Sequence, residues 1–294
     1  MSCPECFRGT VHTRTQPTGG FQNLGGIRTY IAGGSDPTRS KSTIIYLPDA
    51  FSLRLVNNMI LADKYAELTG CRVLIPDIVF NNGLNPDIFP YMEMTLTPIP
   101  KFSVRSIAQK VLATLYILPQ VLPFVLFGHP KRVYPKLLQF TRAMRQEIPA
   151  GGKLGVSGFC WGGWGSTMLC TETTIDGGSE RLIDAQFNGH PSYLNESADM
   201  IRRAIEEFRV PYSSAVAGDD WEFNAQVANN IEANIRERLS EGSGDGNEDY
   251  KYEFKVYKGC KHGFCVRAKE DEINMEGYNA ALLQAVNWFN KYLN

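Results

Sequence analysis

KLGVSGFCWGGWGST, residues 153–167, is the stretch that decides the fold. A short apolar run leads into glycines around Cys160, and small residues and helix formers follow. We therefore predict a strand, a sharp turn and a helix. This is the form of the nucleophile elbow, G-x-S-x-G, with Cys160 where serine usually stands. The glycines are needed because side chains two positions from the nucleophile would collide with the crossing backbone.

The predicted turn places Cys160 at the start of a helix, where free N–H groups and the helix dipole favour a thiolate. The alternative is a buried, inert cysteine beside a glycine turn, since free cysteine is among the most buried residue types. This stretch alone leaves both interpretations open, and the rest of the chain has to decide between them.

Composition places the chain among globular proteins. It has 294 residues, of which 43% are hydrophobic and 21% charged, enough for one large α/β domain. The formal net charge of −1 gives no overall field to attract nucleic acid or an anionic membrane. The N-terminal MSCPECFRGT lacks the apolar core of a signal peptide, so we expect a cytoplasmic protein with seven reduced cysteines.

Cys3 and Cys6 form a C-x-x-C pair near His12. A structural zinc site would need a second pair, which the rest of the chain lacks. A redox pair would need a strand before it and a helix after it, and Pro4 stands inside the motif. We therefore expect a surface or packed N-terminal segment here and no metal site, since no His, Asp or Glu cluster has metal spacing.

The chain alternates strands and helices from end to end, so residues 1–294 are expected to form a single domain. Residues 1–25 are expected to be an extended N-terminal arm. The order strand, helix, strand over 42–77 implies a parallel sheet with right-handed crossovers, doubly wound with helices on both faces. Strands are predicted at 26–32, 42–47, 72–77, 181–187, 210–217 and 250–257, and helices at 55–69, 131–147, 224–239 and 274–292.

Residues 80–130 interrupt this rhythm. The run VLATLYILPQVLPFVLFG, residues 111–128, approaches the roughly 20 residues that a membrane span needs. Pro119 and Pro123 stand inside it, and each costs a helix interior roughly 3 kcal/mol. We therefore expect two short helices forming an apolar cap, with a subunit contact in a homodimer or a membrane-surface element for 104–128 as alternatives. A membrane partner is not expected.

Three polar groups fall at the carboxyl ends of predicted strands: Cys160, an aspartate at 219 or 220, and His262. Ligands bind at this edge of an open parallel sheet. The order nucleophile, acid, base is that of α/β-hydrolases. His262 would take the thiol proton, and the carboxylate would fix the histidine tautomer. Asp220 is favoured over Asp219, which follows Gly218 directly and could instead cap the next helix.

Attack by Cys160 would create an oxyanion, which needs two N–H donors. One is the amide after the nucleophile, that of Trp161. The other comes from the loop after an early strand, here Pro48-Asp49-Ala50-Phe51, so Ala50 is the predicted donor.

At these residues the sequence resembles the dienelactone hydrolase family, and more narrowly its fungal members. LPDAF, RVLIPD, GFCWGG, NGHPS, the D-x-x-F segment and KHGF occur in the family's order over nearly the whole chain. The resemblance implies an α/β-hydrolase fold, no cofactor, and a triad of Cys160, Asp220 and His262. This triad would open a lactone or ester of a small molecule through a thioester acyl-enzyme. D-x-x-F supports Asp220 as the acid, and His190 in GHPS matches a structural motif.

The same resemblance assigns roles around the triad. Asp49 takes the place of an acidic residue that holds the resting cysteine and releases it when substrate binds, and Phe51 beside it is a candidate substrate contact. Bacterial members bind the substrate carboxylate with arginines, whereas this chain has Asn81 at one such position. At the other, Val266 stands four residues after the histidine and Arg267 one further on. At least one clamp is missing or moved, so we expect a bulkier, less charged substrate from aromatic or polyketide metabolism.

Two other functions remain open on the sequence alone. The fold could serve a non-catalytic ligand-binding protein, with the elbow kept for packing. The same triad could also support a lactonising or acyl-transfer enzyme. A covalent adduct with an activated ester would separate catalysis from binding, and product analysis would separate hydrolysis from transfer.

Overall fold

The computed structural model describes residues 9–11, 15–33, 40–98, 103–195, 197–242, 250–269 and 271–294. Its strands form one eight-stranded sheet in the order β1-β2-β4-β3-β5-β6-β7-β8. The pairs from β4 to β8 are parallel, whereas β1 and β2 run antiparallel at one edge. The strands are β1 Gly20–Leu24, β2 Ile27–Ala32, β3 Thr43–Leu47, β4 Arg72–Pro76, β5 Leu154–Phe159, β6 Ala185–Gly189, β7 Tyr212–Ala217 and β8 Tyr252–Tyr257.

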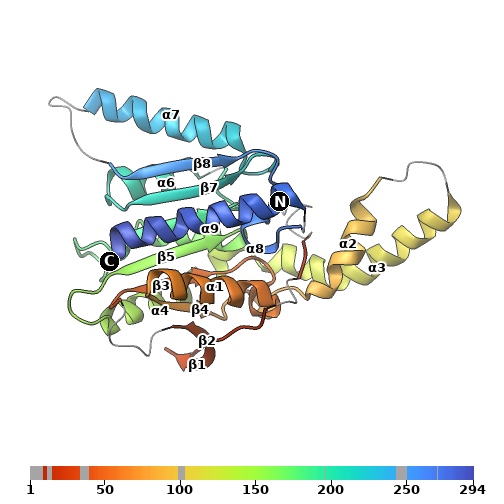
Figure 1. Ribbon diagram of the computed structural model, residues 1–294, viewed down its shortest axis with the longest axis horizontal. Coiled ribbons are helices and arrows are strands. Elements are labelled where there is room, and N and C mark those ends of the chain that lie inside the picture. The colour runs from red at the N-terminus through yellow and green to blue at the C-terminus, as the bar shows by residue number, and fades with distance from the viewer. Residues whose placement is uncertain are drawn as a thin grey trace.

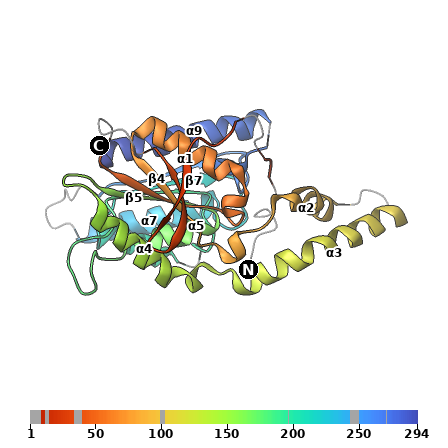
Figure 2. The same cartoon turned by 90° about the horizontal axis from the view of Figure 1, so that it is seen from below.

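Helices cover both faces of this sheet. Helices α1 and α9 lie on one face, and α4, α5, α6 and α7 lie on the other (Figures 1 and 2). The helices are α1 Val56–Thr69, α2 Phe89–Leu96, α3 Val104–Phe127, α4 Tyr134–Glu147, α5 Trp161–Leu169, α6 Ala198–Glu206, α7 Ala225–Gly242, α8 Phe264–Arg267 and α9 Glu272–Leu293. The predicted α/β-hydrolase fold, a doubly wound and mostly parallel sheet, is confirmed.

The buried strand β3 shows how the sequence builds two cores. Ile44 and Tyr46 point to the face under α1 and α9, whereas Ile45 and Leu47 point to the face under α4 and α5. Successive side chains of a strand alternate between faces, so a strand covered on both sides needs a continuous apolar run. That is why the run at 42–47 identifies a central strand.

Most predicted boundaries shift by one to three residues, and two larger differences have a physical reason. Strand β6 begins at Ala185 rather than at 181, because Asp184 is held by polar partners: its carboxylate accepts the Leu154 amide and pairs with Arg145. The expected N-terminal arm also contains a strand, since residues 20–24 pair antiparallel with β2. Of the earlier residues, Cys3, Cys6 and His12 lie outside the described residues.

The expected pair of short helices at 111–128 is wrong, because α3 is one helix of 24 residues with both prolines inside it. Together with α2 it extends away from the sheet as an arm (Figures 1 and 2). Pro119 and Pro123 stand one turn apart, and each removes one backbone bond, to the carbonyl of residue 115 or 119. The helix surface is exposed at Leu115 and Pro119, where such carbonyls can turn toward solvent instead.

Candidate active site

The turn between β5 and α5 has the geometry of a nucleophile elbow. Cys160 has φ 49° and ψ −114°, a conformation that side-chain-bearing residues rarely adopt. Its carbonyl accepts hydrogen bonds from the amides of Gly163 (3.0 Å) and Ser192 (2.8 Å). A Cβ at Gly162 would lie 2.2 Å from the Leu47 carbonyl oxygen, and one at Gly158 would lie 2.3 Å from Ser166 Oγ. Both glycines are therefore required by close approach.

His262 and Asp220 form a buried pair after the neighbouring strands β7 and β8. His262 Nδ1 lies 2.7 Å from Asp220 Oδ2, and both side chains are inaccessible to solvent. The second oxygen of Asp220 accepts the Glu222 amide at 2.9 Å, which fixes the carboxylate. Asp219, the rival acid, has an exposed side chain, and its backbone amide donates to the Cys260 carbonyl. The imidazole therefore pairs with Asp220.

Cys160 and His262 gather at the carboxyl edge of the sheet. The ring of His190, at the end of β6, packs edge-on against His262 with 5.0 Å between ring centres. The Cys160 amide donates to the carbonyl of Gly189, directly before His190. His190 is fully buried, and burial lowers the pKa of its imidazole well below the usual value. It is therefore a neutral packing partner of His262.

Ser192 and Glu222 also belong to this site, although neither is predicted from the sequence. Ser192 Oγ donates toward Cys160 Sγ at 3.7 Å. The Glu222 carboxylate accepts the Tyr193 amide at 2.6 Å and also lies within hydrogen-bonding reach of the Ser192 hydroxyl, whose single proton can be donated either to Glu222 or to Cys160 Sγ. Burial raises the pKa of Glu222. The charge of Cys160 raises this pKa further and that of His262 lowers it, so Cys160 and His262 are both close enough to interact electrostatically with Glu222. Glu222 stands two residues after Asp220, a proximity that could have drawn attention to it.

Asp49 and Arg267 form a second buried charge pair near the elbow. Arg267 Nη1 lies 2.5 Å from Asp49 Oδ2, and both side chains are fully buried. The other carboxylate oxygen accepts the Phe51 amide (3.1 Å) and the Asn58 side chain (3.0 Å). Burial raises the pKa of Asp49, Arg267 opposes that shift, and Cys160 adds to it. Arg267 is thus engaged by a carboxylate of the protein itself.

The remaining predicted residues occupy three different settings. Ala50 and Trp161 follow β3 and β5, which pair side by side with Leu47 opposite Gly158. The Phe51 ring is buried with its centre 4.6 Å from that of Phe89, at the start of α2. Asn81 has φ 51° and an exposed side chain, and its carbonyl accepts from Arg54.

The base of the arm packs into the hydrophobic core beside this site. Buried side chains of α2 and α3 belong to the same hydrophobic core as Cys160, Ala50 and Phe51, namely Phe89, Met92, Ile117 and Phe124. The indole N–H of Trp161 also donates to the carbonyl of Gly128, directly after α3. The residue next to Cys160 is therefore tied to the end of the long helix.

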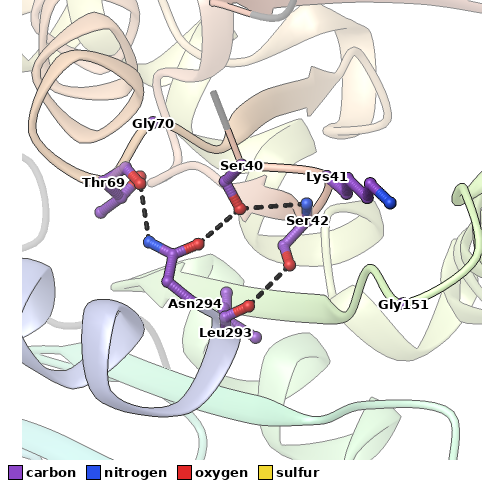
Figure 3. Close-up of a pocket in the computed structure, with 8 residues that line it drawn as sticks. All are labelled: Ser40, Lys41, Ser42, Thr69, Gly70, Gly151, Leu293 and Asn294. Atoms are coloured by element: carbon purple, nitrogen blue, oxygen red, sulfur yellow. Dashed lines mark hydrogen bonds between the residues drawn. The ribbon is translucent and has the colours of Figure 1, made fainter. Parts of the chain in front are cut away.

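An open recess of about 580 Å³ lies at the opposite edge of the sheet. It is lined by residues around the starts of β3 and β5, and its polar groups hold the last residues of the chain. Asn294 bonds Ser40 and Thr69, and Ser42 Oγ donates to the Leu293 carbonyl (Figure 3). The described residues contain no cluster of His, Cys, Asp or Glu suited to a metal ion. The elbow is therefore the better candidate site.

Comparisons with known proteins bear on the family and the fold. The sequence model of the dienelactone hydrolase family matches residues 27–293. Hydrolase tropI of Talaromyces stipitatus is 25% identical over 100% of this chain and 96% of its own length. Dienlactone hydrolase 1 of Gibberella moniliformis is 23% identical over 90% of this chain and 83% of its own. A crystal structure titled as a putative dienelactone hydrolase of Klebsiella pneumoniae shares the fold, with TM-score 0.62, 15% identity, and coverage of 95% and 100%.

Proposed function

The chain belongs to the dienelactone hydrolase family, and on that premise we propose that it hydrolyses its substrate through Cys160, His262 and Asp220. Family membership makes it a carboxylic ester hydrolase. The observation that carries the proposal is the buried 2.7 Å contact between His262 Nδ1 and Asp220 Oδ2, on the sheet edge that also carries the strained Cys160. It supports a histidine held in the tautomer that a nucleophile needs.

The first half-reaction forms a thioester. With Nδ1–H donated to Asp220, the Nε2 of His262 carries no proton and accepts the thiol proton of Cys160. The sulfur attacks the ester carbonyl, and the oxyanion accepts hydrogen bonds from the amides of Ala50 and Trp161. The bond to the leaving oxygen then breaks, and the imidazolium returns its proton to that oxygen. The alcohol leaves, or stays attached as a hydroxyl when the substrate is a lactone.

The second half-reaction releases the acid. His262 removes a proton from water, whose oxygen attacks the thioester carbonyl, and the same two amides hold the oxyanion. Collapse expels the Cys160 sulfur, which recovers a proton from the imidazolium. No cofactor enters either step.

Ser192, Glu222 and Asp49 would adjust the reactivity of the sulfur. The hydroxyl of Ser192 can stabilise a thiolate at Cys160, whereas negative charge on Glu222 or Asp49 opposes it. Burial favours the neutral form of Glu222, and Arg267 compensates the charge of Asp49. The surroundings therefore limit the negative charge that a thiolate has to face.

The substrate would be an apolar or aromatic ester, lactone or thioester, such as a polyketide-type compound. Arg267 is paired with Asp49 and the Asn81 side chain is exposed, so neither supports a clamp for a substrate carboxylate. The base of the arm instead brings Phe89 against Phe51, and Met92 and Ile117 belong to the same core. An apolar wall with few polar groups is typical of sites for apolar ligands.

The test is a burst experiment with an activated aryl ester. Wild-type protein should release one equivalent of phenol rapidly and carry the acyl group on the peptide containing Cys160. Cys160→Ala should lose both, and Cys170→Ala, which removes a buried cysteine at the end of the neighbouring helix, should keep both. An adduct on another residue would contradict the proposal, and product analysis with added alcohols separates hydrolysis from acyl transfer.

A further inference from the structure

The outer surface of α3 is apolar and uncovered. The apolar window of this helix is only 17% buried, whereas its length and hydropathy would suit a membrane span. Its exposed large apolar side chains are Val104, Ile107, Val111, Leu112, Leu115, Tyr116, Leu118, Leu122, Val125, Leu126 and Phe127. Monomeric soluble proteins rarely leave a continuous apolar surface of this extent in water, so it marks an interaction site.

The spacing of buried residues shows that only one side of α3 serves the protein itself. Ala113, Ile117 and Phe124 are spaced by four and seven residues, which places them on one side of the helix, and this side faces α2 and the core. The exposed apolar residues occupy most of the remaining circumference. A core helix would be buried all round and an ordinary surface helix would be polar outside, and α3 is neither.

Charge on α3 and on the segment that follows it is of one sign. Between Glu93 and Glu147 the sequence contains no acidic residue, whereas it contains eight basic ones. Arg105 and Lys110 stand in the first two turns of α3, where Lys110 Nζ donates to the Thr95 and Thr97 carbonyls, and Lys131 and Arg132 follow its end. A second copy docked on this face would bring these cations together without carboxylates of the segment to meet them. An anionic surface would match them at both ends.

We propose that the arm docks the protein on an anionic lipid surface, with α3 lying in the plane of the bilayer interface. A helix of 24 residues is about 36 Å long. Basic residues at both of its ends reach one layer of headgroups only if the helix lies flat, because a crossing orientation would carry Arg105 and Lys110 through the hydrocarbon. The net charge of the whole chain is only −1 because acidic residues elsewhere balance the basic residues of this segment.

If the protein has the function proposed above, docking also affects how substrate reaches the active site. Ile117 and Phe124 of α3 share a core with Cys160, and Gly128 is bonded to Trp161. The end of α3 that touches the site would then lie at the lipid interface. Apolar esters dissolved in the membrane would thus reach Cys160 with a short transfer.

Vesicle flotation tests the proposal with full-length protein. Vesicles of phosphatidylcholine alone are compared with vesicles that also contain phosphatidylserine, at low and high salt. Wild type should float with the anionic vesicles, and high salt should weaken this binding. Leu112→Glu/Leu115→Glu changes side chains that are 66% and 59% exposed and should reduce binding at least about tenfold.

A matched control carries the same charges elsewhere. Ile175→Glu/Leu283→Glu changes side chains that are 62% and 56% exposed, outside the arm, and should bind like wild type. Circular dichroism and turnover of a soluble ester show that each variant is folded, independently of flotation. Arg105→Gln/Arg132→Gln should lose the salt-sensitive part of binding.

Three outcomes would overturn the proposal. Wild type does not float with anionic vesicles, or the arm variant floats as well as the control, or α3 forms a concentration-dependent dimer that Leu112→Glu/Leu115→Glu abolishes while vesicles have no effect. If the wild-type protein does not turn over any soluble ester but still floats with anionic vesicles, the proposed function is wrong and the docking proposal is retained.

Discussion

The elbow and the arm carry comparable apolar sequence but opposite environments. In α5, eight of nine residues are buried. The turn before it has no room for a side chain at Gly158 or Gly162, because an added Cβ would lie only 2.2–2.3 Å from neighbouring atoms. In α3, three of 24 residues are buried. Steric contacts within the chain therefore define the elbow, whereas most of the surface of the arm is not covered by the chain itself. Variants that strain either region sharpen this contrast.

The largest effect is expected at the triad acid. Asp220→Asn should lower kcat/KM by about 10²- to 10⁴-fold, because the amide would favour the wrong histidine tautomer. Asp219→Asn, next to it but exposed, should leave kcat/KM near the wild-type value. Steady-state kinetics with an aryl ester measures both. Equal losses in the two variants would remove Asp220 from its assigned role.

A leucine pair compares the two helices directly. Leu169 in α5 is fully buried, whereas Leu112 in α3 is 66% exposed. Leu169→Ala should lower the free energy of unfolding by about 2–5 kcal/mol through a cavity in the core. Leu112→Ala should change that free energy by less than about 0.5 kcal/mol. Urea denaturation gives both values, and a similar loss in both would show that the arm packs more tightly than described.

The glycines of the elbow should tolerate no side chain. In Gly162→Ala the new Cβ would meet the backbone of Leu47, which cannot move without shifting β3, so we expect a loss of about 1–3 kcal/mol. Gly20→Ala is the control, because a Cβ there meets nothing within 4 Å. Thermal unfolding of the two variants compares them, and an unchanged Tm for Gly162→Ala would break the steric account.

The smallest effect concerns pH. The pKa of Glu222 is raised in the folded protein, so the folded state binds more protons than the unfolded state above the ordinary glutamate pKa. Stability contributed by this group is therefore present at low pH and is lost as pH rises through the raised value. Glu222→Gln should flatten that decline, as chemical denaturation over a pH series would measure. A steeper decline in the variant would contradict the assigned direction.

Features that depend on short stretches of sequence could be predicted. Strand β3, the elbow and the pair of His262 with Asp220 follow from apolar runs, glycine sterics and strand ends. Ser192 and Glu222 could not be predicted, because they lie in loops after β6 and β7 that only the folded sheet brings close to Cys160. The continuity of α3 could not be predicted, because each proline by itself disfavours a helix interior, whereas a long helix with exposed carbonyls tolerates both prolines.

The central claim is that His262 makes the Cys160 sulfur reactive, and the pH dependence of iodoacetamide labelling tests it most directly. Wild type should label at Cys160 first and near neutral pH. His262→Asn should delay labelling of Cys160 until the pH approaches the usual thiol pKa of about 8.5. Identical labelling profiles for the two proteins would contradict the account.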